Sequence, residues 1–345
     1  MTRPPQPALE AAMRRALELA AAPGVPAGPN PRVGCVLLAP DGSTVAEGHH
    51  RGAGTPHAEA DALAAAGEAA RGTTAVVTLE PCAHTGRTGP CAQALVDAGV
   101  EHVVYAQDDP NPVAAGGAGV LRAAGVDVEN GLLAAEAEAL NETWTFAVVH
   151  GRPFVTWKSA ATLDGRIAAA DGSSRWITSA PARAEVHALR AAVDAVVVGT
   201  GTVLADDPHL AVRRDGEVAE GRQPLRVVVG VRDIPAGARV LDAAAQTLHL
   251  RTRDPHEVLA ALHGLEVQHV LLEGGPTLAA AFVRAGLVDA VRWYAAPALL
   301  GAGRSALDDA GMESVAQALR LDVVDVARVG DDVRIDARVR RERGR

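Results

Sequence analysis

Three residues that commonly bind zinc, His57, Cys82 and Cys91, constrain this chain more than any other feature. One imidazole and two thiolates supply three protein ligands and leave a fourth position for water. That is the composition of a catalytic zinc site rather than of a closed structural one. A fold that uses this site must bring together three positions that are spread over the first third of the sequence.

Glu59 adds an acid to this set, because it is spaced to reach a water at the open position without itself binding the metal. His-x-Glu followed by Pro81-Cys82 is the pattern of cytidine and adenosine deaminases. That pattern has two residues between its cysteines, whereas here eight residues, 83–90, intervene. The alternative interpretation is a pair of buried cysteines and a histidine that caps a helix. Cys35 lies within an apolar segment and is predicted to pack in the core.

Composition and charge favour a small-molecule partner. The 345 residues suggest two domains, and 48% apolar residues suffice for two cores. A net charge of −9 without long runs of one sign argues against a nucleic-acid or membrane-surface binder. Charged residues interrupt the N-terminal segment, and no apolar stretch approaches the ~18 residues that span a bilayer. We therefore expect a cytoplasmic protein without membrane or nucleic-acid partners.

Hydrophobic periodicity predicts two successive α/β units, 1–150 and 151–345, with a boundary near 148–152. In the first unit, helices are expected over 8–21, 57–65, 91–98, 120–124 and 134–143, and strands over 33–38, 44–47, 75–79, 103–106 and 126–129. In the second, strands are expected over 154–157, 195–198, 226–229, 269–272 and 291–295, helices over 182–191 and 277–285, and antiparallel strands from 319 onward.

The second unit carries weaker signals. Gly199-Thr200-Gly201 and Glu273-Gly274-Gly275-Pro276-Thr277 each follow a predicted strand, and their backbone amides could bind a dinucleotide phosphate. Taken alone, each is also compatible with an ordinary turn. Lys158 is the only lysine of the chain, and an amine offers chemistry that arginine does not. It is either specifically required or an accidental survivor of a composition rich in arginine.

The motifs of the first unit resemble the bifunctional riboflavin-biosynthesis deaminase–reductase family. The matching segments are Gly28–Gly34, Thr55–Ala60, Thr78–His84, Gly86–Thr88 and Asp109–Pro112. The resemblance implies a cytidine-deaminase-like domain with one Zn²⁺ and a phosphoribosylated diaminopyrimidinone as substrate. It implies the substrate contacts Asn30, His50, His84 and Arg87, although each could equally be a turn or surface residue. Gly89 departs from the family, which usually has a second proline there.

The resemblance continues through the second unit, at Arg152–Val155, Lys158, Leu163–Arg166, Trp176–Ser179, Leu189–Arg190, Gly199–Pro208, Leu210, Arg213 and Leu272–Leu278. It implies a dihydrofolate-reductase-like α/β reductase that uses NADPH. Residues along the cofactor would be Ala160, Trp176, Thr202, Asp206, Gly275, Pro276, Thr277, Leu278, Ala279, Ala280 and Ala281. Substrate contacts would be Ser174, Arg190, Leu210, Arg213 and Glu273, and Lys158 and Asp206 are the candidates for proton handling.

Three arginines of the second unit bear on phosphate binding. Arg190 and Arg213 could clamp the substrate phosphate, because guanidinium groups bind phosphate bidentately. They could instead form surface salt bridges. Arg232 stands in Gly230-Val231-Arg232, where the family often has Asp-Ser. It could meet the 2′-phosphate of the coenzyme, or it could be a solvated side chain.

The resulting hypothesis is a zinc-dependent pyrimidine deaminase joined to an NADPH-dependent reductase of the ribosyl side chain. A nucleic-acid deaminase would require a basic groove and stacking aromatics, which an acidic chain with 3% aromatic residues disfavours. A second domain that only binds ligand would have lost its proton-handling groups, but Lys158 and Asp206 are present. The expected partners are small phosphoribosyl pyrimidines, and a homo-oligomer remains open.

Overall fold

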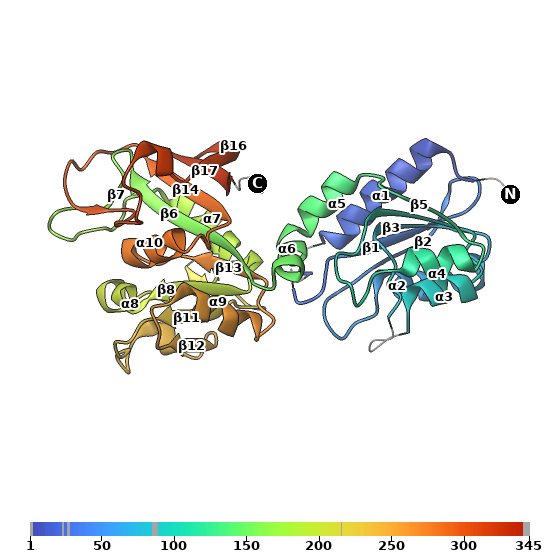
Figure 1. Cartoon of the computed structure of the whole chain (residues 1–345), viewed down its shortest axis with the longest axis horizontal. Coiled ribbons are helices and arrows are strands. Elements are labelled where there is room, and N and C mark those ends of the chain that lie inside the picture. Colours follow the sequence, from blue (N-terminus) through green and yellow to red (C-terminus); the bar gives the residue numbers. More distant parts are fainter. Residues whose placement is uncertain (1–2, 23, 26–27, 85–88, 215, 341–345) are drawn as a thin grey trace. The chain divides into compact units, whose positions relative to one another are not determined.

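The computed structural model describes residues 3–22, 24–25, 28–84, 89–214 and 216–340. It divides into two compact units, Met1–Gly151 and Arg152–Arg345, both of which are α/β (Figure 1). None of the helices in these ranges combines the length and apolar character needed to cross a bilayer.

The first unit is built on a five-stranded sheet of order β2-β1-β3-β4-β5. Strand β1 is antiparallel to both its neighbours, whereas β3, β4 and β5 run parallel. The strands are β1 (Gly34–Leu38), β2 (Thr44–His49), β3 (Thr74–Leu79), β4 (His102–Gln107) and β5 (Asp127–Asn130). The helices are α1 (Gln6–Ala20), α2 (Ala58–Ala66), α3 (Cys91–Asp97), α4 (Gly117–Ala123), α5 (Ala134–Leu140) and α6 (Glu142–His150), with a 3₁₀ turn η1 (Gly67–Ala70).

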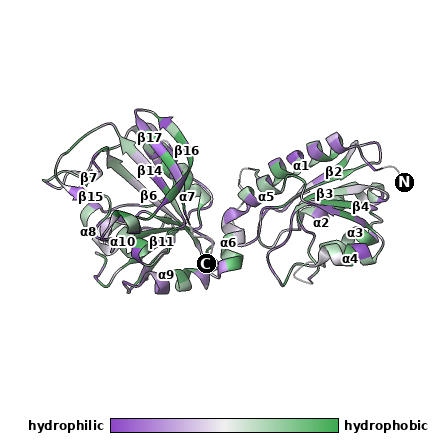
Figure 2. Ribbon diagram, turned by 45° about the horizontal axis from the view of Figure 1, so that its top comes forward, coloured by the Kyte–Doolittle hydropathy of each residue, from purple (hydrophilic) through white to green (hydrophobic). Residues whose placement is uncertain are grey.

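Helices cover both faces of this sheet. On one face, Leu9 and Met13 of α1 pack with Ala137 of α5 against β1, β3 and β4. On the other, α2, α3 and α4 pack against the same strands, and Cys35 is fully buried there as predicted. Figure 2 shows hydrophilic and hydrophobic residues side by side along α1, as expected of an amphipathic helix.

The second unit is built on an eight-stranded sheet of order β12-β11-β8-β13-β6-β14-β17-β16. The first six strands in this order are parallel, and β17 and β16 are added antiparallel. The strands are β6 (Phe154–Thr162), β8 (Ala195–Gly199), β11 (Leu225–Val229), β12 (Thr247–Leu250), β13 (His269–Leu272), β14 (Ala290–Ala296), β16 (Leu321–Val329) and β17 (Asp332–Val339). Two small sheets pair β7 (Arg166–Ala168) with β15 (Arg304–Ser305), and β9 (Arg213–Arg214) with β10 (Glu217–Val218).

Helices also lie on both faces of the larger sheet. Helices α9 (Pro255–His263) and α10 (Pro276–Arg284) pack on one face. Helices α7 (Ala180–Ala192) and α8 (Thr200–Asp206) pack on the other. Two 3₁₀ turns, η2 (Arg239–Leu241) and η3 (Val315–Gln317), complete the unit. Ligands of open parallel sheets bind beyond the carboxyl ends of the strands, which directs attention to the loops after β8, β11 and β13.

The structure departs from the sequence prediction at several elements. The helix expected over 134–143 is two helices, α5 and α6, that meet at Asn141. The buried Asn141 side chain accepts a hydrogen bond from the Arg32 backbone N–H at 2.9 Å and donates one to the Arg32 carbonyl at 3.0 Å. This tertiary contact fixes the break. Helices α8 and α9 and strand β12 were not predicted, and β6 extends five residues beyond the expected 154–157.

Candidate active sites

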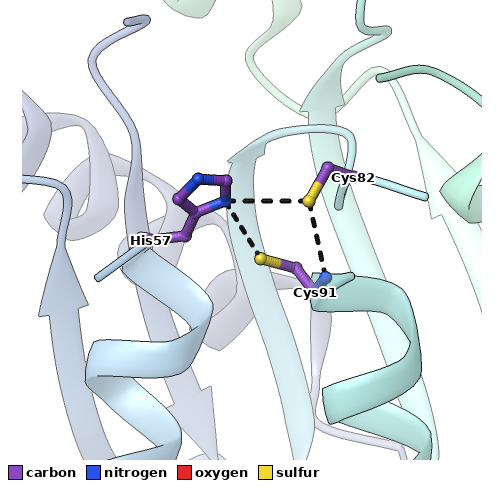
Figure 3. A group of neighbouring side chains, drawn as sticks. All are labelled: His57, Cys82 and Cys91. Carbon is purple, nitrogen blue, oxygen red and sulfur yellow. Dashed lines mark hydrogen bonds between the residues drawn. The ribbon is translucent and has the colours of Figure 1, made fainter. Parts of the chain in front are cut away.

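The first unit brings the three predicted zinc ligands together (Figure 3). His57 immediately precedes α2, Cys91 is the first residue of α3, and Cys82 lies in the loop after β3. The Nδ1 atom of His57 lies 3.2 Å from Cys91 Sγ and 3.7 Å from Cys82 Sγ. The three donor atoms all lie within 4.8 Å of one another. These separations suit one ion with metal–nitrogen and metal–sulfur bonds of about 2.0–2.3 Å.

The electrostatics of the two cysteines also fit a divalent cation. A hydrogen bond from Cys91 lowers the pKa of the Cys82 thiol well below its ordinary value. The same interaction raises the pKa of Cys91 far above its ordinary value. Both cysteines are buried, so without a cation two thiolates this close would repel one another. Zn²⁺ favours the ionised form of both sulfurs, and the donor set therefore fits the metal.

Glu59 lies on α2 in the cavity next to these ligands. The cavity has a volume of about 190 Å³ and is lined by His57, Glu59 and Cys82 among others. Glu59 is 3% exposed, and burial raises its pKa to about 7. A carboxylate with a raised pKa can both take and return a proton near neutral pH.

Asn30, His50 and His84, which were predicted to contact the substrate, also line this cavity. His50 Nδ1 lies 2.9 Å from the Pro56 carbonyl, which can only accept a hydrogen bond, so this nitrogen carries the proton. His50 Nε2 then accepts a hydrogen bond from Asn30 Nδ2 at 2.9 Å. The amide oxygen of Asn30 is thereby left for another donor. Arg87 lies outside the described residues.

Glu80 and Asp109 also line the cavity but were not among the predicted site residues. Glu80 is buried and accepts hydrogen bonds from the backbone N–H groups of Asp109, Gly116 and Ala118, at 3.3, 3.2 and 3.0 Å. It therefore fixes the loop after β4 beside the zinc ligands. Burial raises the pKa of Asp109 to about 6. The sequence signal available for both was their place at the carboxyl ends of β3 and β4.

The second unit holds a cluster of charged groups around Glu273. Arg190 donates hydrogen bonds to both carboxylate oxygens of Glu273, at 2.7 and 2.9 Å, and both side chains are largely buried. Lys158, on β6, faces this pair. Burial lowers the pKa of Lys158, repulsion from Arg190 lowers it further, and Glu273 opposes the shift.

His187 joins this cluster and was not predicted. Its Nδ1 accepts the backbone N–H of Arg213 at 3.2 Å, so the neutral ring carries its proton on Nε2. Its spacing of three residues from Arg190 on helix α7 was the signal that could have identified it.

A second cavity, of about 490 Å³, lies at the carboxyl ends of the parallel strands. Glycines allow the segments around this cavity to pack closely on one another. A Cβ on Gly230 would lie 2.5 Å from Thr200 Oγ1, and one on Gly274 would lie 2.7 Å from a Leu278 side-chain carbon. Of the predicted cofactor-binding residues, Thr202, Gly275, Thr277, Leu278 and Ala281 line this cavity. A glycine-rich cleft beside a helix start fits a dinucleotide.

The other predicted residues of this site lie elsewhere. Ala279 and Ala280 are buried against the sheet, because a helix presents only one face to a cleft and these residues are on the opposite face of α10. Pro276, at the start of α10, is also buried. Leu210 is also a core residue, at 3% exposure. Ala160, Ser174, Trp176 and Asp206 are outside the lining of the cavity. Trp176 is 70% exposed and packs under the Arg183 guanidinium.

Asp206 and Lys158, the two candidates for proton handling, differ in their surroundings. Asp206 is an exposed residue at the end of α8, and its backbone carbonyl accepts a hydrogen bond from Arg175 at 2.7 Å. Lys158 lies within the charged cluster around Glu273.

Comparisons with known proteins agree with both sites. Residues 7–107 match the family described as "Cytidine and deoxycytidylate deaminase zinc-binding region", and residues 153–335 match "RibD C-terminal domain". The "Riboflavin biosynthesis protein RibD" of Mycobacterium tuberculosis (strain H37Rv) is 52% identical over 308 residues, covering 88% of this chain and 90% of that protein. The Escherichia coli K12 protein of the same name is 41% identical over 356 residues, covering 93% and 96%.

Solved structures show the same likeness. RibD of Acinetobacter baumannii superposes with a TM-score of 0.88 at 39% identity, covering 97% of this chain and 99% of that one. A diaminohydroxyphosphoribosylaminopyrimidine deaminase/5-amino-6-(5-phosphoribosylamino)uracil reductase from Thermotoga maritima gives a TM-score of 0.87 at 34% identity, covering 96% and 99%.

The fold and the sites define a zinc-dependent deaminase joined to an NADPH-dependent reductase. Within that class, the chain belongs to the RibD family of bifunctional enzymes of riboflavin biosynthesis. It is therefore both a hydrolase and an oxidoreductase, with zinc and NADPH as cofactors, and the cytidine-deaminase-like and reductase folds expected from the sequence are confirmed.

Proposed function

We propose that the first unit deaminates 2,5-diamino-6-(5-phosphoribosylamino)pyrimidin-4(3H)-one and that the second reduces the ribosyl group of 5-amino-6-(5-phosphoribosylamino)uracil to ribityl. The observation that carries the deaminase proposal is the His57, Cys82 and Cys91 donor set with Glu59 in the adjoining cavity. The printed activities of the Thermotoga maritima relative support the choice of substrates.

In the deamination step, zinc held by Nδ1 of His57 and the two sulfurs would supply a Lewis acid that makes a water acidic near neutral pH. The Glu59 carboxylate takes up a proton as the oxygen of that water bonds to the amine-bearing carbon. The two protons of the water pass to a ring nitrogen and to the amine, which leaves as ammonia. Asn30 Oδ1 accepts from an N–H of the pyrimidinone ring, because its amide nitrogen is engaged by His50. His84 donates a hydrogen bond to the substrate from its buried Nδ1, for which no partner is found among the described residues.

In the reduction step, NADPH would supply the hydride, and the protein aligns the sugar and supplies a proton. We assign the proton to Lys158 Nζ, because Lys158 is partly buried beside Glu273 and Arg190 and desolvation lowers its pKa. Asp206, exposed at the end of α8 and outside the lining of the second cavity, is not assigned this proton.

Purified full-length enzyme with zinc tests both activities. Addition of the diaminopyrimidinone phosphate should release ammonia first and then consume NADPH, one equivalent of each per substrate. Ammonia release without subsequent loss of NADPH would contradict the reductase half. NADPH loss with the deaminated substrate but no ammonia from the diamino compound would contradict the deaminase half.

We further propose that residues 1–150 and 151–345 fold and act as separate domains. The division at Gly151 supports this proposal. An expressed first segment that binds zinc and releases ammonia would support it, and one that stays unfolded at all temperatures would place the boundary elsewhere. The proposed small-molecule partners and the cytoplasmic location rest on the sequence, which leaves a homo-oligomer open. Cell fractionation and sedimentation of the intact protein test the last two.

A further inference from the structure

The cavity at the carboxyl ends of the strands in the second unit is unusually poor in acids. Among the residues that the structure describes, its lining includes Arg232, Arg253 and Arg304 but no aspartate or glutamate. The whole chain carries a net charge of −9. A cavity with three arginines and no carboxylate in an acidic protein fits an anionic ligand.

Two of these arginines occupy corresponding positions on neighbouring strands. Strands β11 and β12 are parallel, with Val229 opposite Leu250. Arg232 and Arg253 each stand three residues beyond that pair. The Gly230 N–H donates to the Leu250 carbonyl at 3.0 Å and continues the pairing into the loops. The loops after β11 and β12 therefore leave the sheet side by side, and each carries an arginine three residues beyond the last paired residue of its strand.

The position of Arg232 is further defined by two glycines. Gly230 has a φ of +135°, and a Cβ there would lie 2.5 Å from Thr200 Oγ1, so its lack of a side chain lets the loop pack on α8. A Cβ on Gly201 would lie 3.1 Å from Arg232 Nη2. The Arg232 guanidinium therefore lies over the start of α8, at the wall of the cavity.

Neither Arg232 nor Arg253 forms an ion pair or a side-chain hydrogen bond within the part of the chain that the structure describes. The acids next to them in sequence have other partners: Asp233 is paired with Arg251, and Asp254 accepts a hydrogen bond from the His256 backbone N–H at the start of α9. Other arginines of the unit behave differently. Arg152, Arg190 and Arg292, for example, are each paired with a carboxylate.

We propose that Arg232 and Arg253 bind the 2′-phosphate of NADPH and thereby set the preference of the reductase for NADPH over NADH. In dinucleotide-binding folds, an acid at the end of a neighbouring strand binds the ribose 2′-hydroxyl of NADH, whereas an arginine there accommodates the 2′-phosphate. The end of β11 carries Gly230, Val231 and Arg232, and thus an arginine and no acid. The inference rests on the proposed reductase function, with the coenzyme bound in this cavity.

Equilibrium binding to the full-length protein tests this assignment without relying on turnover. The dissociation constants of NADPH, NADH and 2′,5′-ADP are measured for wild type, Arg232→Ser, Arg253→Ser and the double variant. Charge-assisted hydrogen bonds predict that each single variant weakens NADPH binding about 10- to 100-fold, while NADH binding changes less than about 3-fold. The double variant should lose binding of 2′,5′-ADP. Arg328→Ser is the control, because Arg328 is exposed on β16 and outside the cavity lining.

The outcomes separate this inference from the proposed function. An unchanged NADPH-to-NADH ratio in the double variant, with tight NADPH binding by wild type, overturns the assignment of the arginines and leaves the reductase proposal intact. Equal weakening of NADPH and NADH also overturns it, because the arginines would then contact a part common to both coenzymes. Wild-type protein that binds neither coenzyme contradicts the proposed reductase function itself.

Discussion

Arg190 donates two hydrogen bonds to Glu273, from Nε to Oε1 at 2.7 Å and from Nη2 to Oε2 at 2.9 Å, and so links helix α7 to the loop after β13. The sequence suggested that both residues contact the substrate. In the structure each is the principal partner of the other, and the remaining Arg190 nitrogen, Nη1, points to the Ala211 carbonyl at 3.4 Å. Arg190 therefore holds Glu273 in position, and the edge of its guanidinium formed by Nε and Nη2 is occupied by that carboxylate.

The first prediction concerns the stability of this pair. Arg190→Met should leave the Glu273 charge buried with only Lys158 nearby, and removing one member of a buried ion pair costs about 3–5 kcal/mol. The double variant Arg190→Met/Glu273→Met should recover part of that loss, because the Glu273 carboxylate is then no longer left without Arg190, although Lys158 loses its countercharge. Urea denaturation, followed through the unfolding transition of the reductase unit, measures the stability of both variants. Equal stability of Arg190→Met and wild type would show that the pair contributes nothing.

Arg213 becomes the better candidate for the substrate phosphate. Its backbone N–H is fixed by His187, and its Nε is buried without a partner among the described residues. Arg213→Lys should raise the KM for the phosphorylated substrate about 10-fold, because lysine cannot bind phosphate bidentately. The KM for NADPH and the turnover of a dephosphorylated substrate should change little. Steady-state kinetics of Arg214→Lys, at an exposed neighbour, is the control. Arg213→Lys with wild-type kinetics would assign the phosphate to other donors.

Lys158 should lower the stability of the folded protein while it donates the proton in the reductase reaction. Its pKa in the folded protein is lowered by burial, whereas an unfolded lysine titrates near 10.4. The charged form is therefore penalised on folding at pH values below about 10.4, and the penalty vanishes above that value. Lys158→Met should unfold at a higher temperature than wild type at pH 7, with a gain that shrinks toward pH 11. Its reductase kcat should fall by about 10²–10⁴.

Lys158→Arg is the matched control for this prediction, because it keeps a cation that does not release its proton. It should lose kcat as Lys158→Met does, without the gain in melting temperature. Wild-type kcat in both variants would remove Lys158 from the reaction. A Lys158→Met protein that is less stable than wild type at pH 7 would show that the amine is stabilising.

The zinc site could be predicted from the sequence because its ligands stand beside local signals. Each of His57, Cys82 and Cys91 borders a helix or strand that periodicity identifies. The partners of Glu80 could not be predicted, since the N–H groups of Gly116 and Ala118 are brought to it only by the pairing of β3 with β4.

Dependence on tertiary contacts also explains what the sequence could not show in the second unit. Arg190 and Glu273 are 83 positions apart, and their pairing depends on how α7 packs on the sheet. Helix α8 begins with Thr200, Gly201 and Thr202, residues of low helix propensity, so the sequence pattern does not predict a helix there. For α10, the family resemblance implied cofactor contacts at seven successive residues, 275–281. It could not distinguish the residues that face the cavity from those that pack on the sheet.

Metal content should distinguish the ligand cysteines from the core cysteine. We expect about one zinc per chain by elemental analysis of purified protein. Cys82→Ser should lose the metal and the deaminase activity, because it removes one of three ligands. Cys35→Ser should keep both, because Cys35 is fully buried among the side chains of the first core. Full deaminase activity in metal-free wild-type protein would end the zinc assignment.

The last prediction separates the role of Glu59 from those of the ligands. Glu59 is 3% exposed and lies in the zinc cavity, but it is not one of the three grouped donor residues. Glutamine has nearly the same shape and cannot carry the proton, so Glu59→Gln should slow ammonia release by about 10²–10⁴. Zinc content should remain that of wild type, and NADPH oxidation with already deaminated substrate should be unchanged.

Glu136→Gln, at an exposed position on α5, is the control for this substitution and should behave as wild type in all three measurements. Each result that differs from the expected one would point to a different cause. Loss of zinc from Glu59→Gln would make Glu59 part of the metal site. Undiminished ammonia release would mean that another group, such as Asp109 in the same cavity, carries the proton. Loss of both ammonia release and NADPH oxidation would mean that the two reactions depend on one another, because a side chain buried in the first unit would then control chemistry in the second.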